Sequence, residues 1–206
     1  MRGSRKLAIG TVVVLMTTAG LSGVPAAAHD GNGHGEDGRD HVIKVAMLDR
    51  CDPVTFAAGF GNGTAPPGTS FCEPVRQHRR VVTYFDLLHS FDSATHTADP
   101  AWRFSRTRIE AEVGDTIHAT NLGGQFHSFT EVPAFGGGCN EYFTRWVGLD
   151  SLPEFRANCP FYIGTVQRPG QTTTIALISA GEHKFMCVIH PWMKATVDVK
   201  SDEGDD

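Results

Sequence analysis

The odd number of cysteines is the feature that most constrains how this chain can fold. The sequence contains five: Cys51, Cys72, Cys139, Cys159 and Cys187. Spare thiols tend to pair in an oxidising compartment, so two disulfides would leave one cysteine over, and that cysteine needs another role. Four cysteines allow three connectivities. We favour the local pairs Cys51–Cys72 and Cys139–Cys159, because each brackets one Gly/Pro-rich segment, and this choice leaves Cys187 free.

The N-terminus predicts export to such a compartment. Basic residues near the start precede a largely apolar run at 7–24, and an alanine-rich stretch ending at Ala28 offers a small-residue cleavage site. This is the layout of a secretory signal peptide. An uncleaved membrane anchor is the competing interpretation, because the apolar run approaches spanning length. We predict a signal peptide at 1–28 and an exported protein, secreted or periplasmic, with no membrane span after cleavage.

The charge of the mature protein argues against one class of partner. Cleavage after Ala28 removes three basic residues and no acidic ones, so the formal net charge changes from −5 to −8. The phosphates of a nucleic acid would repel a surface of that sign. The same charge favours solubility and can steer encounters with a basic partner. We therefore expect no nucleic acid among the partners.

The hydrophobic pattern predicts one all-β domain at 42–200. A His/Gly/Asp-rich segment at 29–41 has no apolar periodicity and is typical of a disordered arm, and 201–206 forms an acidic tail. About eight short segments between them are β-like and separated by turn signals, which favours an antiparallel sandwich or barrel with disulfide-stapled loops. The expected strands lie at 42–48, 81–88, 103–112, 116–120, 126–132, 172–178, 183–187 and 195–200.

Details of this pattern add three expectations. Residues 50–80 should form a stapled loop, and 133–160 should form a long irregular insertion with a short helix near 141–147. No helix of greater length is expected anywhere in the chain. In the alternating segment after Arg103, the side chains available for a buried face are those of Phe104, Ile109, Ala111 and Val113.

A seven-residue stretch near the C-terminus carries most of the chemical information. It reads Cys187-Val188-Ile189-His190-Pro191-Trp192-Met193 and places a thiolate, an imidazole and a thioether three residues apart on one tight loop. Two histidines and one cysteine with a distant axial methionine form the electron-transfer copper site, whereas calcium and magnesium prefer oxygen ligands. Zinc is disfavoured, because methionine is a poor zinc ligand and no second cysteine is nearby.

The second histidine of such a set has to come from elsewhere in the chain. His127 is the best candidate, because it follows Gly123 and Gly124 after an expected strand. His118 is a rival, but it shares its strand face with polar residues, so a surface position is the simpler interpretation. Ser128 is a candidate for bracing the ligand loop by a hydrogen bond, although a plain surface serine explains it equally well.

Several stretches of this sequence resemble the cupredoxin family of small copper proteins. The final Cys187-x-x-His190-Pro-x-Met193 motif has the compact ligand spacing of amicyanin, and the stretches around 113–118 and 181–187 are similar to two recognisable family segments. The resemblance covers about 103–200. It implies a Greek-key β-sandwich that holds one type 1 copper ion. By position it implies His127 and His190 as equatorial ligands, Cys187 as the thiolate and Met193 as the axial ligand.

The remaining histidines have simpler interpretations. His183 lies on the strand before Cys187 and is expected to be partly buried and hydrogen-bonded. His29, His34 and His41 of the arm are candidates for weak metal binding only. A copper brace at a new N-terminal His29 would need a structured partner histidine, which the surrounding Gly/Asp-rich sequence does not favour.

These features predict a copper protein that transfers single electrons between redox partners. A copper-handling protein that sequesters or delivers the ion is the alternative, and a small copper oxidoreductase is a weaker one. Four protein ligands leave no open position for a substrate, and the chain lacks the His-x-His pairs of multicopper enzymes, so we expect no enzyme. We expect a monomer whose partner docks on an exposed apolar patch formed by Val188, Ile189, Pro191 and Trp192.

Overall fold

The computed structural model describes residues 41–58, 71–74, 81–151 and 153–201. The predicted signal peptide, the arm up to residue 40 and residues 202–206 of the acidic tail lie outside the described residues. No helix in the described part of the chain is long and apolar enough to cross a membrane.

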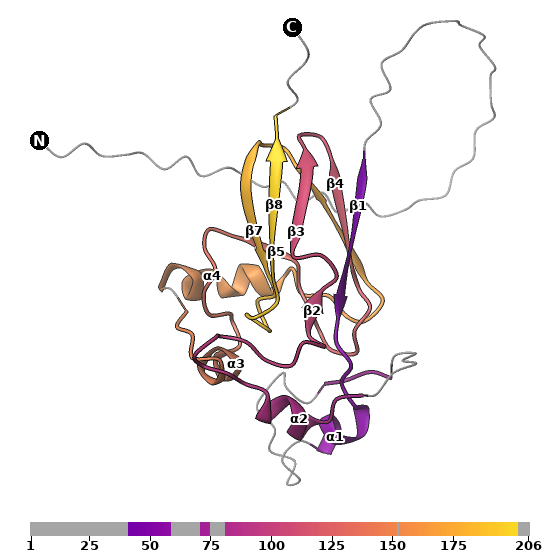
Figure 1. Ribbon diagram of the computed structural model, residues 1–206, viewed down its shortest axis with the longest axis vertical. Coiled ribbons are helices and arrows are strands. Elements are labelled where there is room, and N and C mark those ends of the chain that lie inside the picture. The colour runs from indigo at the N-terminus through magenta and orange to yellow at the C-terminus, as the bar shows by residue number, and fades with distance from the viewer. Residues whose placement is uncertain (1–40, 59–70, 75–80, 152, 202–206) are drawn as a thin grey trace, which may run out of the picture. The chain divides into compact units, whose positions relative to one another are not determined.

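Two sheets form the body of the described chain (Figure 1). The first has the strand order β2-β1-β4-β6 and the second has the order β3-β8-β7-β5. The strands of the first sheet are β1 (Val42–Leu48), β2 (Arg103–Phe104), β4 (Thr116–Asn121) and β6 (Thr172–Ala176). Those of the second are β3 (Arg108–Glu112), β5 (Thr130–Val132), β7 (Gly181–Met186) and β8 (Lys194–Lys200).

The predicted all-β class and the two-layer sandwich are confirmed, but the strand directions differ from the prediction. β1 pairs with β4 in parallel, and β3 pairs with β8 in parallel, so both sheets are mixed rather than antiparallel. Alternation of apolar and polar residues reports that a strand has one buried face. It carries no information on the direction of the neighbouring strand, which explains the error.

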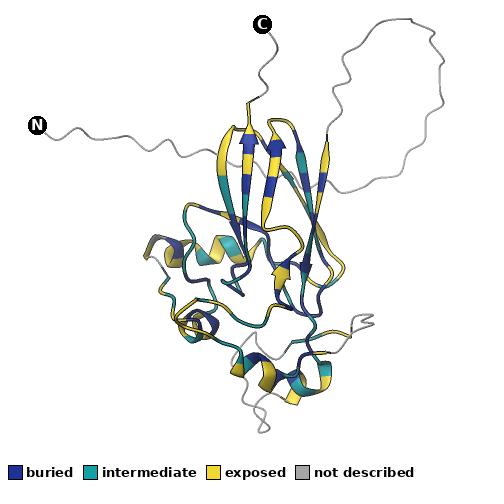
Figure 2. Ribbon diagram, in the orientation of Figure 1, coloured by how far each residue is buried: buried dark blue, intermediate teal, exposed yellow. Residues whose placement is uncertain are grey.

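The core lies between the inner faces of the two sheets. Ile43 and Val45 of β1 and Ile117 of β4 pack in one buried cluster with Phe185 of β7 and Val197 of β8. Figure 2 shows the resulting alternation of buried and exposed bands along the strands. Such interdigitated inner faces are the usual way in which two sheets share one core.

The prediction of the buried face after Arg103 is wrong for one of its four residues. Phe104, Ile109 and Ala111 are buried as expected, but Val113 is exposed. Strand β3 ends at Glu112, and the chain then turns at Gly114, whose φ of 101° suits glycine. The alternation therefore stops one residue before Val113.

The described residues include four helices: α1 (Pro53–Ala58), α2 (Tyr84–His89), α3 (Glu141–Trp146) and α4 (Pro153–Ile163). Figure 1 shows them outside the sheets, toward the end at which β1 finishes. Only α3 was expected. The strand predicted at 81–88 is wrong, because a capping box between Thr83 and Asp86 begins α2 there. The expectation that no helix would be longer than α3 is also wrong, since α4 contains 11 residues despite Pro160.

Both predicted local disulfides are present in the structure, and each closes one of the two inserted segments, 50–80 and 133–160. Cys51–Cys72 and Cys139–Cys159 have Cα–Cα distances of 6.1 and 5.6 Å, and Cys187 is the buried free cysteine. The first disulfide packs on the backbone of Gly124, where an added Cβ would lie 2.7 Å from the Cys51 sulfur. A side chain at position 124 would therefore displace the segment that leads to His127.

Candidate metal centre

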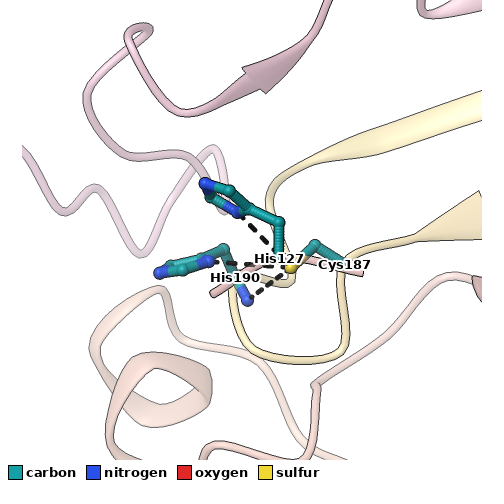
Figure 3. Close-up of side chains that lie close together, drawn as sticks. All are labelled: His127, Cys187 and His190. Carbon is teal, nitrogen blue, oxygen red and sulfur yellow. Dashed lines mark hydrogen bonds between the residues drawn. The ribbon is translucent and has the colours of Figure 1, made fainter. Parts of the chain in front are cut away.

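Three predicted ligands converge at one buried point in the structure. The possible ligand atoms of His127, Cys187 and His190 all lie within 4.8 Å of one another. His127 comes from the segment between β4 and β5, and Cys187 and His190 lie on the loop between β7 and β8 (Figure 3). The fold thus brings together residues 60 positions apart in the sequence.

The two imidazoles present the same nitrogen to the sulfur. The Sγ atom of Cys187 lies 3.6 Å from Nδ1 of His190 and 3.9 Å from Nδ1 of His127. The ring centroids of the two histidines are 4.8 Å apart. All three side chains are at most 1 % exposed. Two nitrogens and one sulfur therefore face a common, water-excluded position.

Backbone hydrogen bonds fix the ligand loop. The N–H groups of Ser128 and His190 both donate to the Cys187 sulfur at 3.4 Å. Ser128 is buried, and its hydroxyl accepts a 3.0 Å hydrogen bond from the N–H of Val188. The proposed bracing role of Ser128 therefore has a structural basis. Such donors stabilise a thiolate and hold its sulfur in place.

Met193 closes the same loop. Its N–H donates to the carbonyl of His190 at 2.9 Å, and its carbonyl accepts from the N–H of Cys187 at 3.1 Å. The side chain is buried in the same cluster as Cys187. The position of Met193 is compatible with an axial ligand, and that role stays a prediction.

Asp49 is the functional residue that the sequence did not reveal. Its Oδ2 atom lies 2.7 Å from Nε2 of His127, and both side chains are completely buried. Three backbone N–H groups also donate to this carboxylate: those of Cys51 and Gly124 to Oδ1 at 3.0 Å, and that of Gln125 to Oδ2 at 2.9 Å. Asp49 and His127 are 78 positions apart, so no local motif could have joined them.

Hydrogen bonds and charges shift the pKa values of these buried groups. Burial alone would raise the pKa of Asp49, but His127 and the backbone donors outweigh it and lower the pKa to about 2. Burial alone would lower the pKa of His127, but Asp49 and Cys187 raise it to about 9. For Cys187, the two histidines overcome the effect of burial and hold the thiol pKa well below its usual value. The thiolate, which is the form that binds metal, is thus favoured.

His190 sits in an aromatic enclosure. Its ring centroid lies 5.1 Å from that of Phe143 on α3 and 5.3 Å from that of Trp192. Nε2 of His190 is buried without a hydrogen-bond partner among the described residues, and burial lowers the pKa of the imidazole. A histidine kept only for hydrogen bonding would not leave this atom unsatisfied. Its placement instead directs Nδ1 toward the sulfur.

The residues predicted to form an exposed docking patch are largely covered in the structure. Val188 and Pro191 are buried, and Ile189 and Trp192 are only partly exposed. The insertion causes the difference, because the N–H of Cys139 donates to the carbonyl of Val188 at 2.6 Å and brings α3 over the ligand loop. The sequence indicated an insertion, but it did not indicate where the insertion would pack.

The other described histidines lie outside the centre. His118 is half-buried on β4 and does not join the cluster, as its strand face predicted. His183 is partly buried and bonds to Glu131 and to the carbonyl of Ser179, which matches the hydrogen-bonded interpretation. His41 is exposed at the end of the arm. His29 and His34 fall outside the described residues.

The residues of the centre fit a copper ion. Two imidazoles and one thiolate are the equatorial set of an electron-transfer copper site, and a buried methionine lies on the same loop. Asp49 is turned away toward Nε2 of His127, so the cluster offers nitrogen and sulfur rather than the oxygen atoms that calcium or magnesium prefers.

Comparison with known proteins shows weak similarity to copper proteins. No family model matches the chain. No curated protein matches either. A purple cupredoxin from Nitrosopumilus maritimus is 18 % identical with a TM-score of 0.34, and the match covers 53 % of this chain and 95 % of that one. Amicyanin from Paracoccus versutus is 21 % identical with a TM-score of 0.32, over 53 % and 90 % of the two chains.

Proposed function

We propose that this protein is an exported type 1 copper protein of the cupredoxin kind that transfers single electrons between redox partners. The observation that carries the proposal is the convergence of Nδ1 of His127, Nδ1 of His190 and Sγ of Cys187 at one buried point. Met193, on the same loop, is the proposed axial ligand. When bound, one copper ion would supply one-electron chemistry by alternating between its Cu(II) and Cu(I) states.

The chain's own residues restrict how far the ligands can rearrange. The N–H groups of Ser128 and His190 hold the sulfur, and Asp49 holds His127 through Nε2. The backbone of His127 is paired in both directions with that of Gln167, at 3.1 and 2.7 Å. Ligands anchored in this way stay in place when the charge of the site changes, which favours fast electron exchange.

Burial of the centre favours electron transfer over copper handling. His190 is 1 % exposed beneath Phe143 and Trp192, so a chelating partner cannot reach the ligand set without displacement of these rings. Electrons can cross a few ångströms of packed protein, whereas an ion needs an open route. Four protein ligands also leave no site for a substrate, which supports a carrier rather than an enzyme.

Two features support an exported protein. The N-terminal segment has the layout of a signal peptide, and the two disulfides suit an oxidising compartment. We further propose a monomer with an acidic surface whose partner is a redox protein.

Electrochemistry and metal transfer test the proposal together. We expect the copper-loaded protein to cycle reversibly between two states, with no turnover of small substrates and slow loss of copper to a chelator. Irreversible redox behaviour, or transfer of the ion within seconds, would instead support copper handling.

A further inference from the structure

The buried pair of Asp49 and His127 carries an inference that deepens the proposed function and rests on it. We propose that Asp49 is a positioning residue that locks His127 in the ligand tautomer and biases the centre toward the more positively charged copper state. Asp49 directly follows strand β1 and contacts Nε2 of His127, the ring nitrogen that faces away from the Cys187 sulfur. It would contact the ion only through the imidazole ring.

The hydrogen bonds around Asp49 determine which nitrogen of His127 carries the proton. Both carboxylate oxygens already accept backbone N–H groups, from Cys51 and Gly124 on Oδ1 and from Gln125 on Oδ2. An ionised carboxylate has no proton to donate, so the 2.7 Å contact with His127 requires the imidazole to donate from Nε2. A metal-bound imidazole carries only one proton, so with that proton on Nε2 the lone pair of Nδ1 lies on the side of Cys187, where a metal ligand is needed.

The charge of Asp49 acts in the same direction as its geometry. The carboxylate is fully buried, so little solvent screens it from the ring that it contacts. A negative group that accepts from a ligating histidine makes that ligand a better electron donor. A better donor stabilises Cu(II) more than Cu(I), so Asp49 should lower the reduction potential.

The chain offers a matched control. Asp115 is also buried, and it also accepts a backbone N–H, from Glu112 at 3.0 Å. It lies just before β4, whereas the segment that contacts Asp49 follows the other end of that strand. Asp115→Asn therefore removes a buried carboxylate without touching the metal ligands.

The test compares Asp49→Asn, Asp115→Asn and the unaltered protein after loading with copper. Loss of an outer carboxylate partner typically lowers metal affinity 10- to 100-fold. We expect the ratio of Cu(II) to Cu(I) affinity to fall about tenfold in Asp49→Asn, which for one electron is a rise of about 59 mV in reduction potential. Asp115→Asn should change this ratio less than twofold. An Asp49→Asn protein that is coloured and has the same reduction potential as Asp115→Asn would overturn this inference but leave the proposed function standing.

A second measurement decides the question if Asp49→Asn does not fold. In nitrogen-labelled, Cu(I)-loaded unaltered protein, the Nε2–H of His127 should give a downfield proton signal protected from exchange with solvent. The Nε2–H of His190 provides an internal comparison, since it has no hydrogen-bond partner in the described structure and should resonate further upfield. A His127 ring without a proton on Nε2 overturns the inference. An unaltered protein that binds no copper overturns both the proposed function and this inference.

Discussion

Replacement of Phe143 by alanine should both destabilise the protein and open the metal centre. Phe143 is fully buried, and its ring lies 5.1 Å from His190, 5.5 Å from Trp192 and 5.8 Å from Phe91. Truncation of a buried phenylalanine costs about 3–5 kcal/mol. For a domain of this size each kcal/mol lowers the melting temperature by about 2–4 °C, so we expect a decrease on the order of 10 °C.

The same substitution has a distinct effect on copper. Phe143 is not a ligand, so the visible spectrum of the loaded protein should be retained. The space left beside His190 admits water and chelators, so loss of copper to a chelator should become at least about tenfold faster, which corresponds to about 1.4 kcal/mol in the barrier. Melting followed by circular dichroism and a chelator-competition assay measure the two effects.

A neighbouring residue provides the control for Phe143→Ala. Tyr142 lies next to it on α3 but is 46 % exposed, so Tyr142→Ala should change stability by less than about 0.5 kcal/mol and leave copper release unchanged. If the two variants behave alike in both assays, α3 does not cover His190, and the account of the enclosed centre is refuted.

Three further outcomes follow from the structure. The pKa of Asp49 is about 2 in the folded protein and lies below its ordinary value of 3.8, so its ionised carboxylate stabilises the fold above pH 3.8 and this stability is lost as the pH falls through 2. Denaturant titrations of the metal-free proteins should show the difference in unfolding free energy between the unaltered protein and Asp49→Asn shrinking by about 2 kcal/mol between pH 3.8 and pH 2. Removal of the Cys139–Cys159 disulfide by a double alanine substitution should cost about 3 kcal/mol in urea unfolding. Met193→Leu should change stability by less than about 1.5 kcal/mol and keep the colour, but should shift the reduction potential if Met193 is the axial ligand.

The sequence predicted the local part of the centre well, because its chemistry is encoded by spacing. Cys187 and His190 lie three positions apart, and cysteine arithmetic identified the free thiol independently. His127 is less sharply specified, because His118 is a rival. Strand-face parity argues against His118, and the preceding glycine pair and the family resemblance favour His127. Both histidines lie where the sequence placed them, His127 in the cluster and His118 outside it.

The parts that failed depend on contacts between distant segments. Asp49 reaches His127 because β1 pairs in parallel with β4, which places the end of β1 beside Gly124. No pattern within either strand specifies that pairing. The segment at 81–88 is rich in β-branched and aromatic residues, yet the capping box at Thr83 begins a helix there. Propensity over eight residues is a weak signal when a local cap and tertiary packing favour another state.

Addition of Cu(II) to the purified metal-free protein tests the central claim most directly. The proposed ligand set predicts that one equivalent of copper produces an intense visible absorption band, caused by charge transfer from the Cys187 thiolate to the metal. Cys187→Ser should lack this colour even when it binds copper. His183 hydrogen-bonds to Glu131 and Ser179 and lies outside the metal centre, so its substitution should leave the colour unchanged. No colour in the unaltered protein, or the same colour in Cys187→Ser, would contradict the account.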